Sequence, residues 1–126
     1  MTLSFGRIVW AEVADANGIR KVRPAVVITP TEEIGEDSSV EVVAVSTRLS
    51  EPLPEDHVLL PWHAQGHPRT KLNRRCAAVC SWVARITPAD VQGMAGVVPD
   101  ALLNEILDRL EFPPPPAEGE PPSAAP

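Results

Sequence analysis

The residues best suited to chemistry are an arginine beside one apolar run and two adjacent hydroxyl residues at the end of another. Arg23 begins the segment Arg-Pro-Ala-Val-Val-Ile, and Ser46 and Thr47 follow a run of alternating valines. A guanidinium keeps its charge and donates two hydrogen bonds to phosphate oxygens from a planar fork. A hydroxyl can donate one further bond to the same oxygens. These side chains could therefore hold a phosphate group if the fold brings them together.

Basic and aromatic side chains gather between residues 57 and 89, a part of the chain without any acidic residue. The segment Arg69–Arg75 could follow a phosphate backbone, and Trp62 could stack on an unpaired base. We expect Trp10 in the core, and Trp82 either in the core or against a base. A charged surface that only faces solvent is the alternative reading of the basic residues. The candidates for contacts with RNA are Lys21, Trp62, His63, His67, Arg69, Lys71, Arg74 and Arg75.

Histidine is the side chain whose ordinary pKa best suits proton transfer near neutral pH, and the chain has His57, His63 and His67. The spacing of the last two, taken with Cys76 and Cys80, superficially resembles a zinc pattern. Both cysteines are expected on one strand, however, where four residues span about 13 Å, too far for two ligands of one ion. We therefore expect no metal and no other cofactor, and we expect the thiols to be buried packing groups.

The elements that must position these residues are mostly strands. Asp15–Gly18 has the chemistry of a tight turn, because Asn and Gly accept a positive φ. Pro24 has no N–H to donate, so its strand should begin there or lie at a sheet edge. The expected strands are Gly6–Val13, Arg23–Pro30, Val40–Thr47, His57–Pro61 and Cys76–Ile86.

Two helices are expected after the last of these strands. Thr87 can cap a short helix in which Pro88 takes the first position and Asp90 completes a capping box. A longer helix should run from about Asp100 to Glu111. The result is a mainly β fold, a small barrel or roll of five strands closed by a helix. The apolar residues at helical spacing in the longer helix are Leu102, Leu103, Ile106, Leu107 and Leu110.

Composition limits the classes of function. The chain has 44% apolar residues, which is typical of a globular protein. Its net charge of −6 means that its overall field does not attract nucleic acid. We expect one domain over residues 1–111 and a Pro-rich, disordered tail over residues 112–126. No segment has the length of a membrane span, and the first residues do not form a secretory signal, so we expect a cytoplasmic protein without a membrane partner.

The order of these segments resembles the MazF/PemK (Kid) family of type II toxin–antitoxin toxins, which are endoribonucleases (mRNA interferases). The opening Gly-Arg-Ile-Val-Trp-Ala-Glu-Val is similar to the first strand of the family, and Arg-Pro-Ala-Val-Val is similar to its most specific signature. Val43–Arg48 resembles the strand that ends in a hydroxyl motif, and Pro52–Pro54 followed by His57–Leu60 also fits. The resemblance extends from about residue 5 to residue 111.

The resemblance implies a small SH3-like β-barrel of the MazF/Kid/CcdB type with a short helix and a C-terminal amphipathic helix. It implies a homodimer that cleaves single-stranded RNA without a metal, leaving a cyclic phosphate and a free hydroxyl. It also implies a cognate antitoxin in the RNA groove and operator DNA bound by the toxin–antitoxin pair. Catalysis is then assigned to Arg23 with Ser46 or Thr47. Neighbouring strand residues face opposite sides, so only one hydroxyl can enter the site, and we prefer Ser46.

The chain departs from the family pattern in the last expected strand, where Ser81-Trp82 stands in place of an acidic residue and a glutamine. This difference removes a polar group from the expected substrate floor. A non-catalytic binding protein on the same fold, such as a gyrase poison or an operon repressor, is therefore an alternative. Another is an adaptor that offers its Pro-rich tail to other domains.

Overall fold

The computed structural model describes residues 3–35 and 39–110, so the tail expected over residues 112–126 lies outside the described residues. Within the described part, six strands form one antiparallel sheet in the order β4-β5-β3-β2-β1-β6. The strands are β1 (Arg7–Ala14), β2 (Arg20–Val27), β3 (Val40–Ser46), β4 (His57–Leu60), β5 (Cys76–Ile86) and β6 (Val91–Val97). The helices are α1 (Asp100–Asp108) and the single 3-10 turns η1 (Thr31–Glu33) and η2 (Pro88–Asp90).

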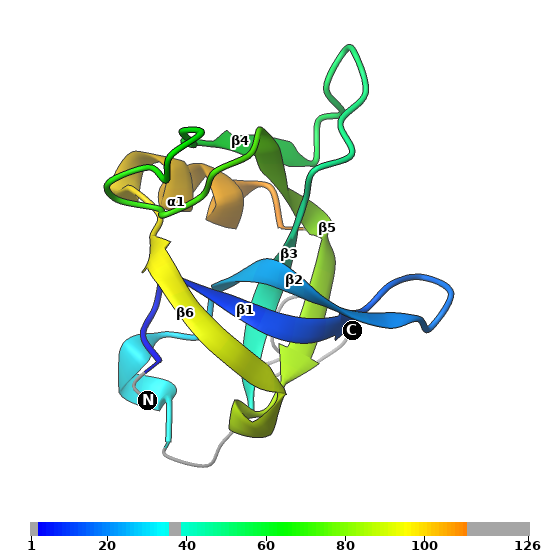
Figure 1. The fold of residues 1–126 in the computed structure, drawn as a ribbon. Coiled ribbons are helices and arrows are strands. Elements are labelled where there is room, and N and C mark those ends of the chain that lie inside the picture. Colours follow the sequence, from blue (N-terminus) through cyan, green and yellow to red (C-terminus); the bar gives the residue numbers. More distant parts are fainter. Residues whose placement is uncertain (1–2, 36–38, 111–126) are drawn as a thin grey trace, which may run out of the picture.

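The sheet is strongly bent, so that it resembles a barrel without closing into one (Figure 1). Alternate residues of its central strands pack into two separate apolar clusters. In β1, Ile8 belongs to the cluster beneath α1, whereas Val9 and Ala11 belong to the cluster on the other face. Both faces of the central strands are therefore buried, which explains why β2 and β3 contain continuous apolar runs rather than an alternation with polar residues. The expected mainly β fold is confirmed.

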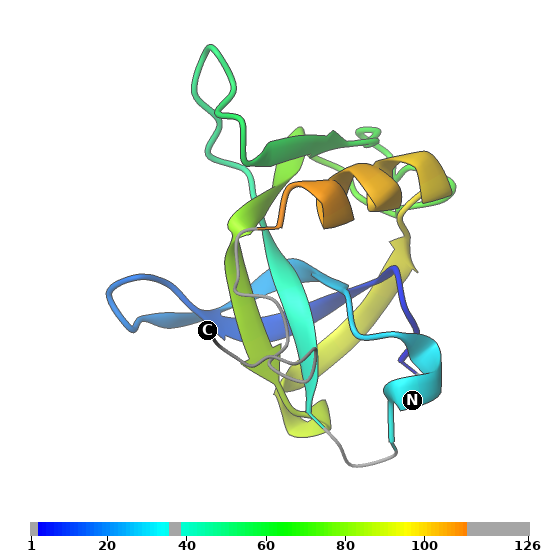
Figure 2. The same cartoon turned by 180° about the vertical axis from the view of Figure 1, so that it is seen from behind.

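Helix α1 lies beside β4 at one end of the bent sheet, as the view from behind shows (Figure 2). Leu103 and Ile106 are buried in the cluster beneath the helix, and Leu102 and Leu110 pack against it. Leu107 is 37% exposed and lies at the margin of the apolar stripe. The predicted helix is confirmed with a slightly earlier end, because the backbone leaves helical geometry at Arg109, and residue 111 lies outside the described part.

The hairpin between β1 and β2 projects beyond the sheet (Figure 1). The predicted turn is confirmed: Gly18 has a φ of +82°. One carboxylate oxygen of Asp15 accepts hydrogen bonds from the backbone N–H groups of Asn17 and Ile19. The Ile19 N–H is the main cause that lowers the pKa of Asp15 below its ordinary 3.8. The charged form of Asp15 thus holds the hairpin turn together.

Strand β2 begins at Arg20, three residues before the predicted start. Its register with β1 runs from Arg20 to Val26, but its register with β3 covers only Ala25, Val26 and Val27. Pro24 directly precedes the pair between Ala25 and Ala44, and it has no N–H to donate to a ladder. The outer half of β2 is therefore paired on one side only. Because β2 is an interior strand of the sheet that begins at Arg20, the expectation that the strand begins at Pro24 or lies at a sheet edge is wrong, although Pro24 stands where pairing with β3 has ended.

The short helix predicted after Thr87 is only one 3-10 turn, and the sixth strand β6 follows it directly. The capping box between Thr87 and Asp90 is present. Gly96 lies within β6 and has a structural role there. Its backbone N–H donates to the carbonyl of Thr70, and a Cβ at this position would overlap the carbonyl of Arg69. A glycine is needed here because loop backbone crosses the strand at contact distance.

The first prediction concerns this crossing. Gly96→Ala should lower the free energy of unfolding by about 3 kcal/mol, since the new methyl group meets backbone that cannot move aside cheaply. Urea denaturation measures the change. Gly93→Ala is the matched control: a Cβ there meets nothing within 4 Å, and its stability should stay within about 0.5 kcal/mol of the unmodified protein. Equal stabilities for the two variants would contradict the close approach.

The second prediction concerns the charge of Asp15. A carboxylate whose pKa is lowered by folding stabilises the fold above its unfolded pKa, and this contribution is lost as the pH falls through the lower, folded pKa. Asp15→Asn should therefore unfold at a lower urea concentration than the unmodified protein near neutral pH. The two midpoints should converge as the pH falls below 3.8. A difference that stays constant over this pH range would show that charge is not involved.

Candidate active site

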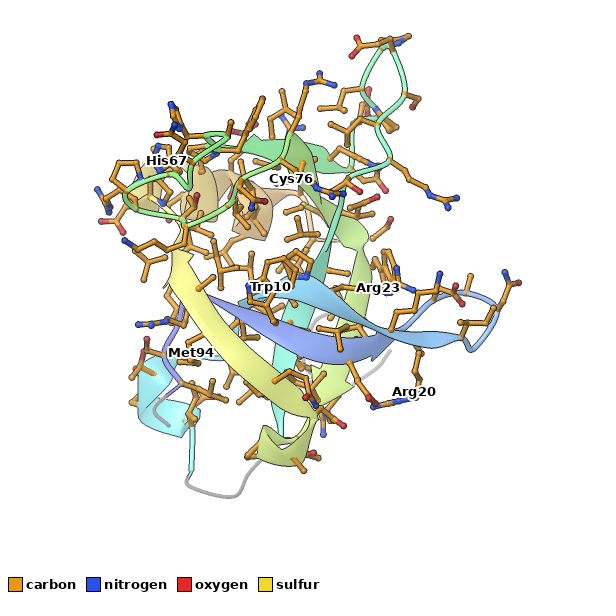
Figure 3. All side chains as sticks on the ribbon, in the orientation of Figure 1. Trp10, Arg20, Arg23, His67, Cys76 and Met94 are labelled. Atoms are coloured by element: carbon orange, nitrogen blue, oxygen red, sulfur yellow. The ribbon has the colours of Figure 1, made fainter. Side chains whose placement is uncertain are left out.

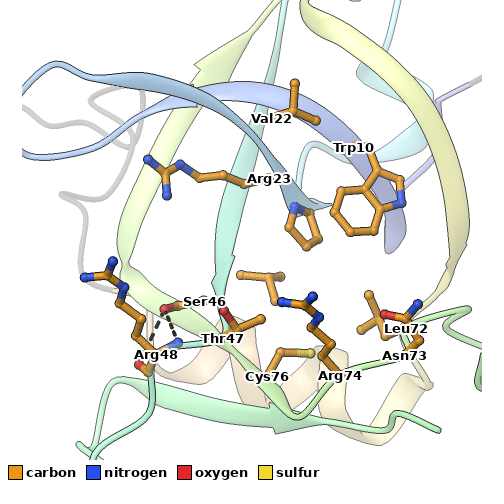
Figure 4. Close-up of a pocket in the computed structure, with 12 residues that line it drawn as sticks. Trp10, Val22, Arg23, Ser46, Thr47, Arg48, Leu72, Asn73, Arg74 and Cys76 are labelled. Atoms are coloured by element: carbon orange, nitrogen blue, oxygen red, sulfur yellow. Dashed lines mark hydrogen bonds between the residues drawn. The ribbon is translucent and has the colours of Figure 1, made fainter. Parts of the chain in front are cut away.

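An open pocket of about 510 Å³ lies where β2 separates from the end of β3 (Figure 4). Its walls come from β1, β2, the end of β3, the loop that precedes β5 and the first residue of β5. Three of the residues expected to carry chemistry, Arg23, Ser46 and Thr47, line it together. The complete lining is Trp10, Val22, Arg23, Pro24, Val45, Ser46, Thr47, Arg48, Leu72, Asn73, Arg74 and Cys76.

The charge of the lining is entirely positive. It contains the guanidinium groups of Arg23, Arg48 and Arg74 and has no carboxylate and no histidine. Among the described residues, Arg48 and Arg74 form no ion pair, whereas Arg75 pairs with Glu51 at 3.1 Å. In Figure 4 the side chain of Arg74 reaches toward the middle of the pocket. The pocket therefore attracts anions although the chain as a whole is acidic.

The two hydroxyl residues occupy different positions at the end of β3. Ser46 is the last residue of the strand, and its Oγ accepts a hydrogen bond of 3.0 Å from the backbone N–H of Arg48. Thr47 follows the strand and is exposed. Both residues line the pocket. The backbone bond fixes the Ser46 oxygen at the turn and leaves its hydroxyl proton for the Arg48 carbonyl, at 3.4 Å, or for another acceptor.

Arg23 is held by three groups at the base of the hairpin. Its Nε–H donates to the carbonyl of Val13 at 3.1 Å, and Nη2 lies 3.7 Å from a carboxylate oxygen of Asp15. The guanidinium carbon lies 4.9 Å from the ring centre of Trp82, within the range of a cation–π contact. The side chain is still 20% exposed. In Figure 4 it points away from Trp10, to the side of the pocket where Arg48 lies.

Apolar side chains form the opposite wall of the pocket. Trp10 on β1 pairs with Pro24 on β2 and with Gly93 on β6. Val22 is 50% exposed and Trp10 37% exposed, so the prediction that Trp10 is a core residue is wrong. The residues before and after it in β1, Val9 and Ala11, are buried. Trp10 itself lies at a register shift between β1 and β6, where the strand bends. Sequence reasoning missed Trp10 and Arg48 as pocket residues.

The thiol of Cys76 is the remaining titratable group in the lining. Burial raises the pKa of Cys76 to about 11, so the thiol keeps its proton at neutral pH. Cys76 and Cys80 are both buried on β5, as predicted for packing groups. In the part of the chain that the structure describes, no group of three or more histidine, cysteine, aspartate or glutamate side chains is arranged to hold a metal ion.

The other predicted RNA contacts lie outside the pocket. His63 and His67 belong to the loop between β4 and β5, where the Nδ1 of each accepts backbone N–H groups of its own turn. Figure 3 places His67 well away from Arg23. Trp62 is 43% exposed in the same loop. Of the eight candidates, Arg74 alone lines the pocket; Lys21, Trp62, His63, His67, Arg69, Lys71 and Arg75 do not.

His57 also has a defined environment away from the pocket. Its Nδ1 lies 2.7 Å from a carboxylate oxygen of Asp56, and the other oxygen of Asp56 accepts a hydrogen bond from the hydroxyl of Ser81. The Ser81 hydroxyl, and then His57, hold the pKa of Asp56 below its ordinary value. This cluster fastens the start of β4 to β5 and is structural rather than part of the pocket.

The described residues include no helix with the length and apolar character that a bilayer span requires.

The comparison with curated proteins gives no match. Among solved structures, MazF (Form-I) from Deinococcus radiodurans has a TM-score of 0.69 at 18% identity and covers 87% of this chain and 94% of its own. The Mycobacterium tuberculosis toxin MazF-mt6 has a TM-score of 0.64 at 15% identity, with 84% and 99% covered. An endoribonuclease in complex with its cognate antitoxin, from a Mycobacterial species, has a TM-score of 0.57 at 14% identity, with 89% and 98% covered.

These structures share the fold of this chain. The sequence itself matches a family model over residues 4–112, a span that includes every strand and the residues of the pocket. The chain therefore belongs to the family of PemK-like, MazF-like toxins of type II toxin–antitoxin systems.

Proposed function

We propose that this toxin is an endoribonuclease that cuts single-stranded RNA in the pocket between β2 and β3. The observation that carries the proposal is the lining: three guanidinium groups and two hydroxyls converge there without any carboxylate. Such a lining suits a phosphodiester and repels no part of it. That MazF toxins and mycobacterial endoribonucleases share the fold supports the same activity.

The reaction that these groups can assist is the attack of a ribose 2′-oxygen on the neighbouring phosphorus. The new O–P bond forms as the bond to the 5′-oxygen breaks, so the products carry a 2′,3′-cyclic phosphate and a free 5′-hydroxyl. Negative charge rises on the phosphate oxygens in the transition state. Arg23 would stabilise that charge through its Nη donors, and Ser46 or Thr47 would add a hydroxyl donor. No metal ion is part of this proposal.

Proton transfer is the step for which the pocket offers the fewest groups. The Cys76 thiol is protonated at neutral pH, and no histidine lines the pocket. A pocket lining with a protonated thiol and without a histidine therefore also favours a second function. In that case the protein is a non-catalytic toxin that binds its target through the same basic surface. Incubation of the purified protein with RNA in EDTA separates the two, because only the enzyme produces cyclic phosphate ends.

The apolar wall gives the pocket a place for a base. Trp10 and Pro24 are adjacent across the β1–β2 ladder, and Trp10 exposes part of its indole. An unpaired base can stack there while its phosphate contacts the arginines. The remaining predicted contacts could follow the RNA beyond the pocket; they are Lys21, Trp62, His63, His67, Arg69, Lys71 and Arg75.

We also propose the partners that such a toxin needs. A cognate antitoxin would occupy the basic pocket and exclude RNA, as a MazE–MazF complex exists for a protein of this fold. The toxin would act as a homodimer in the cytoplasm, and the toxin–antitoxin pair would bind operator DNA. Co-expression with the product of a neighbouring small reading frame, followed by co-purification, tests the antitoxin directly.

The third prediction concerns Arg23. Arg23→Ala should lower the rate of cleavage of a single-stranded RNA at least about a hundredfold, which is typical of the loss of one donor to a developing oxyanion. Single-turnover assays in EDTA measure the rate. Arg85→Ala is the matched control, because Arg85 is an exposed arginine that pairs with Glu41 outside the pocket. Unchanged cleavage by Arg23→Ala would remove this residue from the mechanism.

The fourth prediction concerns Arg48 and Arg74. Each contact with a phosphate of single-stranded RNA contributes about 0.7 to the slope of log affinity against log salt concentration. Arg48→Ala and Arg74→Ala should each weaken binding and reduce the slope by about that amount. Fluorescence anisotropy with a 2′-deoxy analogue of the RNA gives the affinity without cleavage. A weaker affinity with an unchanged slope would mean that the arginines do not contact phosphates.

A further inference from the structure

We propose that Trp82 is a positioning residue that sets the direction of the Arg23 guanidinium. This inference rests on the proposed nuclease function for its catalytic consequence, but the arrangement itself does not depend on it. Three observations carry it: the place of Trp82 in a bulge of β5, the hydrogen bond of its indole N–H, and the stacking of Arg23 on its ring.

The bulge places the indole against the last residue of β1. Val43 of β3 pairs with Val83 of β5, and Val45 pairs with Ala78. Between these pairs β3 contributes only Ala44, whereas β5 contributes residues 79–82. An irregularity of this kind bends a strand and turns a side chain away from the regular alternation. Trp82 is turned toward the outer ends of β1 and β2.

The indole N–H fixes the ring in that position. Trp82 Nε1 donates to the carbonyl of Ala14 at 3.0 Å, which joins β5 to the last residue of β1. The ring also packs, as Ala84 does, against the apolar cluster that contains Val13. The backbone carbonyl of Asp56, the residue before β4, accepts the N–H of Cys80 at 2.6 Å and ties the bulge to that strand. Trp82 is therefore a rigid surface rather than a mobile side chain.

Arg23 lies on this surface with one donor already used. The carbonyl of Val13 takes its Nε–H, and the ring of Trp82 lies beneath the guanidinium carbon. Asp15 reaches only one Nη atom, at the longer distance of 3.7 Å. The ring and the backbone carbonyl thus set the plane of the fork and leave N–H groups for a phosphate. A donor oriented in advance avoids reorganisation during the reaction.

The fifth prediction tests this role with two substitutions. Trp82→Leu should lower the single-turnover cleavage rate about tenfold, equivalent to about 1.4 kcal/mol in the barrier, while the affinity for the 2′-deoxy RNA changes less than threefold. Trp82→Phe retains an aromatic face and should recover most of the rate. Val91→Ala is the matched control, because it removes apolar volume from the same cluster on β6, with β1 between it and Arg23, and should lower the melting temperature without changing the rate.

A second measurement follows Arg23 without any RNA. Its Nε–H resonance, assigned by its loss in Arg23→Lys, should be shifted by the indole ring current and exchange slowly with water. The shift should disappear in Trp82→Leu and persist in Trp82→Phe and Val91→Ala.

The two measurements distinguish a failure of the proposed nuclease function from a failure of the positioning role of Trp82. If the unmodified protein does not cleave RNA, the proposed nuclease function is wrong, and the resonance still decides whether Trp82 orients Arg23. An unshifted resonance, or a folded Trp82→Leu protein that cleaves at the normal rate, would overturn the positioning role.

Discussion

The ladder between β2 and β3 ends at Ala25, and the pocket exists because it ends there. Continued by two residues, the same register would place Arg23 opposite Ser46 as an ordinary cross-strand pair. Pro24 has no N–H to donate at this point, and the outer half of β2 stays paired with β1 alone. The space between the separated strands becomes the pocket, and the side chains that would have faced each other become its walls.

The distribution of ion pairs explains how an acidic protein contains a positive pocket. Among the described residues, Arg20, Arg75 and Arg85 each lie within 3.3 Å of a carboxylate at sites away from the pocket. Arg48 and Arg74 form no such pair and line the pocket. Exposed ion pairs add little to stability, so their main effect here is on the local field. The unpaired guanidinium groups concentrate positive potential where a phosphodiester would bind.

The buried sheet makes this pocket rigid. Its central strands have apolar clusters on both faces, and α1 covers one of them. A catalytic or binding side chain attached to such strands keeps its direction, because the backbone beneath it cannot shift without disturbing a close-packed interior. The hairpin beyond the sheet lacks this support, and the contacts of Trp82 with Ala14 and Arg23 supply it there.

Local signals in the sequence were sufficient for most elements and for the family. The turn at Asp15–Gly18, the capping box of Thr87, the apolar stripe of α1 and the long strand β5 all follow from residues near one another in the chain. The choice of Arg23 with Ser46 and Thr47 also came from the sequence, because each lies in a short contiguous motif. The role of each in catalysis remains a prediction.

What only the tertiary structure decided depends on contacts between distant residues. The sequence did not predict strand β6. The need for a glycine at position 96 comes from contact with loop backbone around Arg69, which no local pattern records. The exposure of Trp10, the pocket position of Arg48 and the stacking of Arg23 on Trp82 follow from where strands part or bulge. By itself the sequence determined which residue types are available for chemistry and which segments extend; register and strand separation determined which of those residues meet.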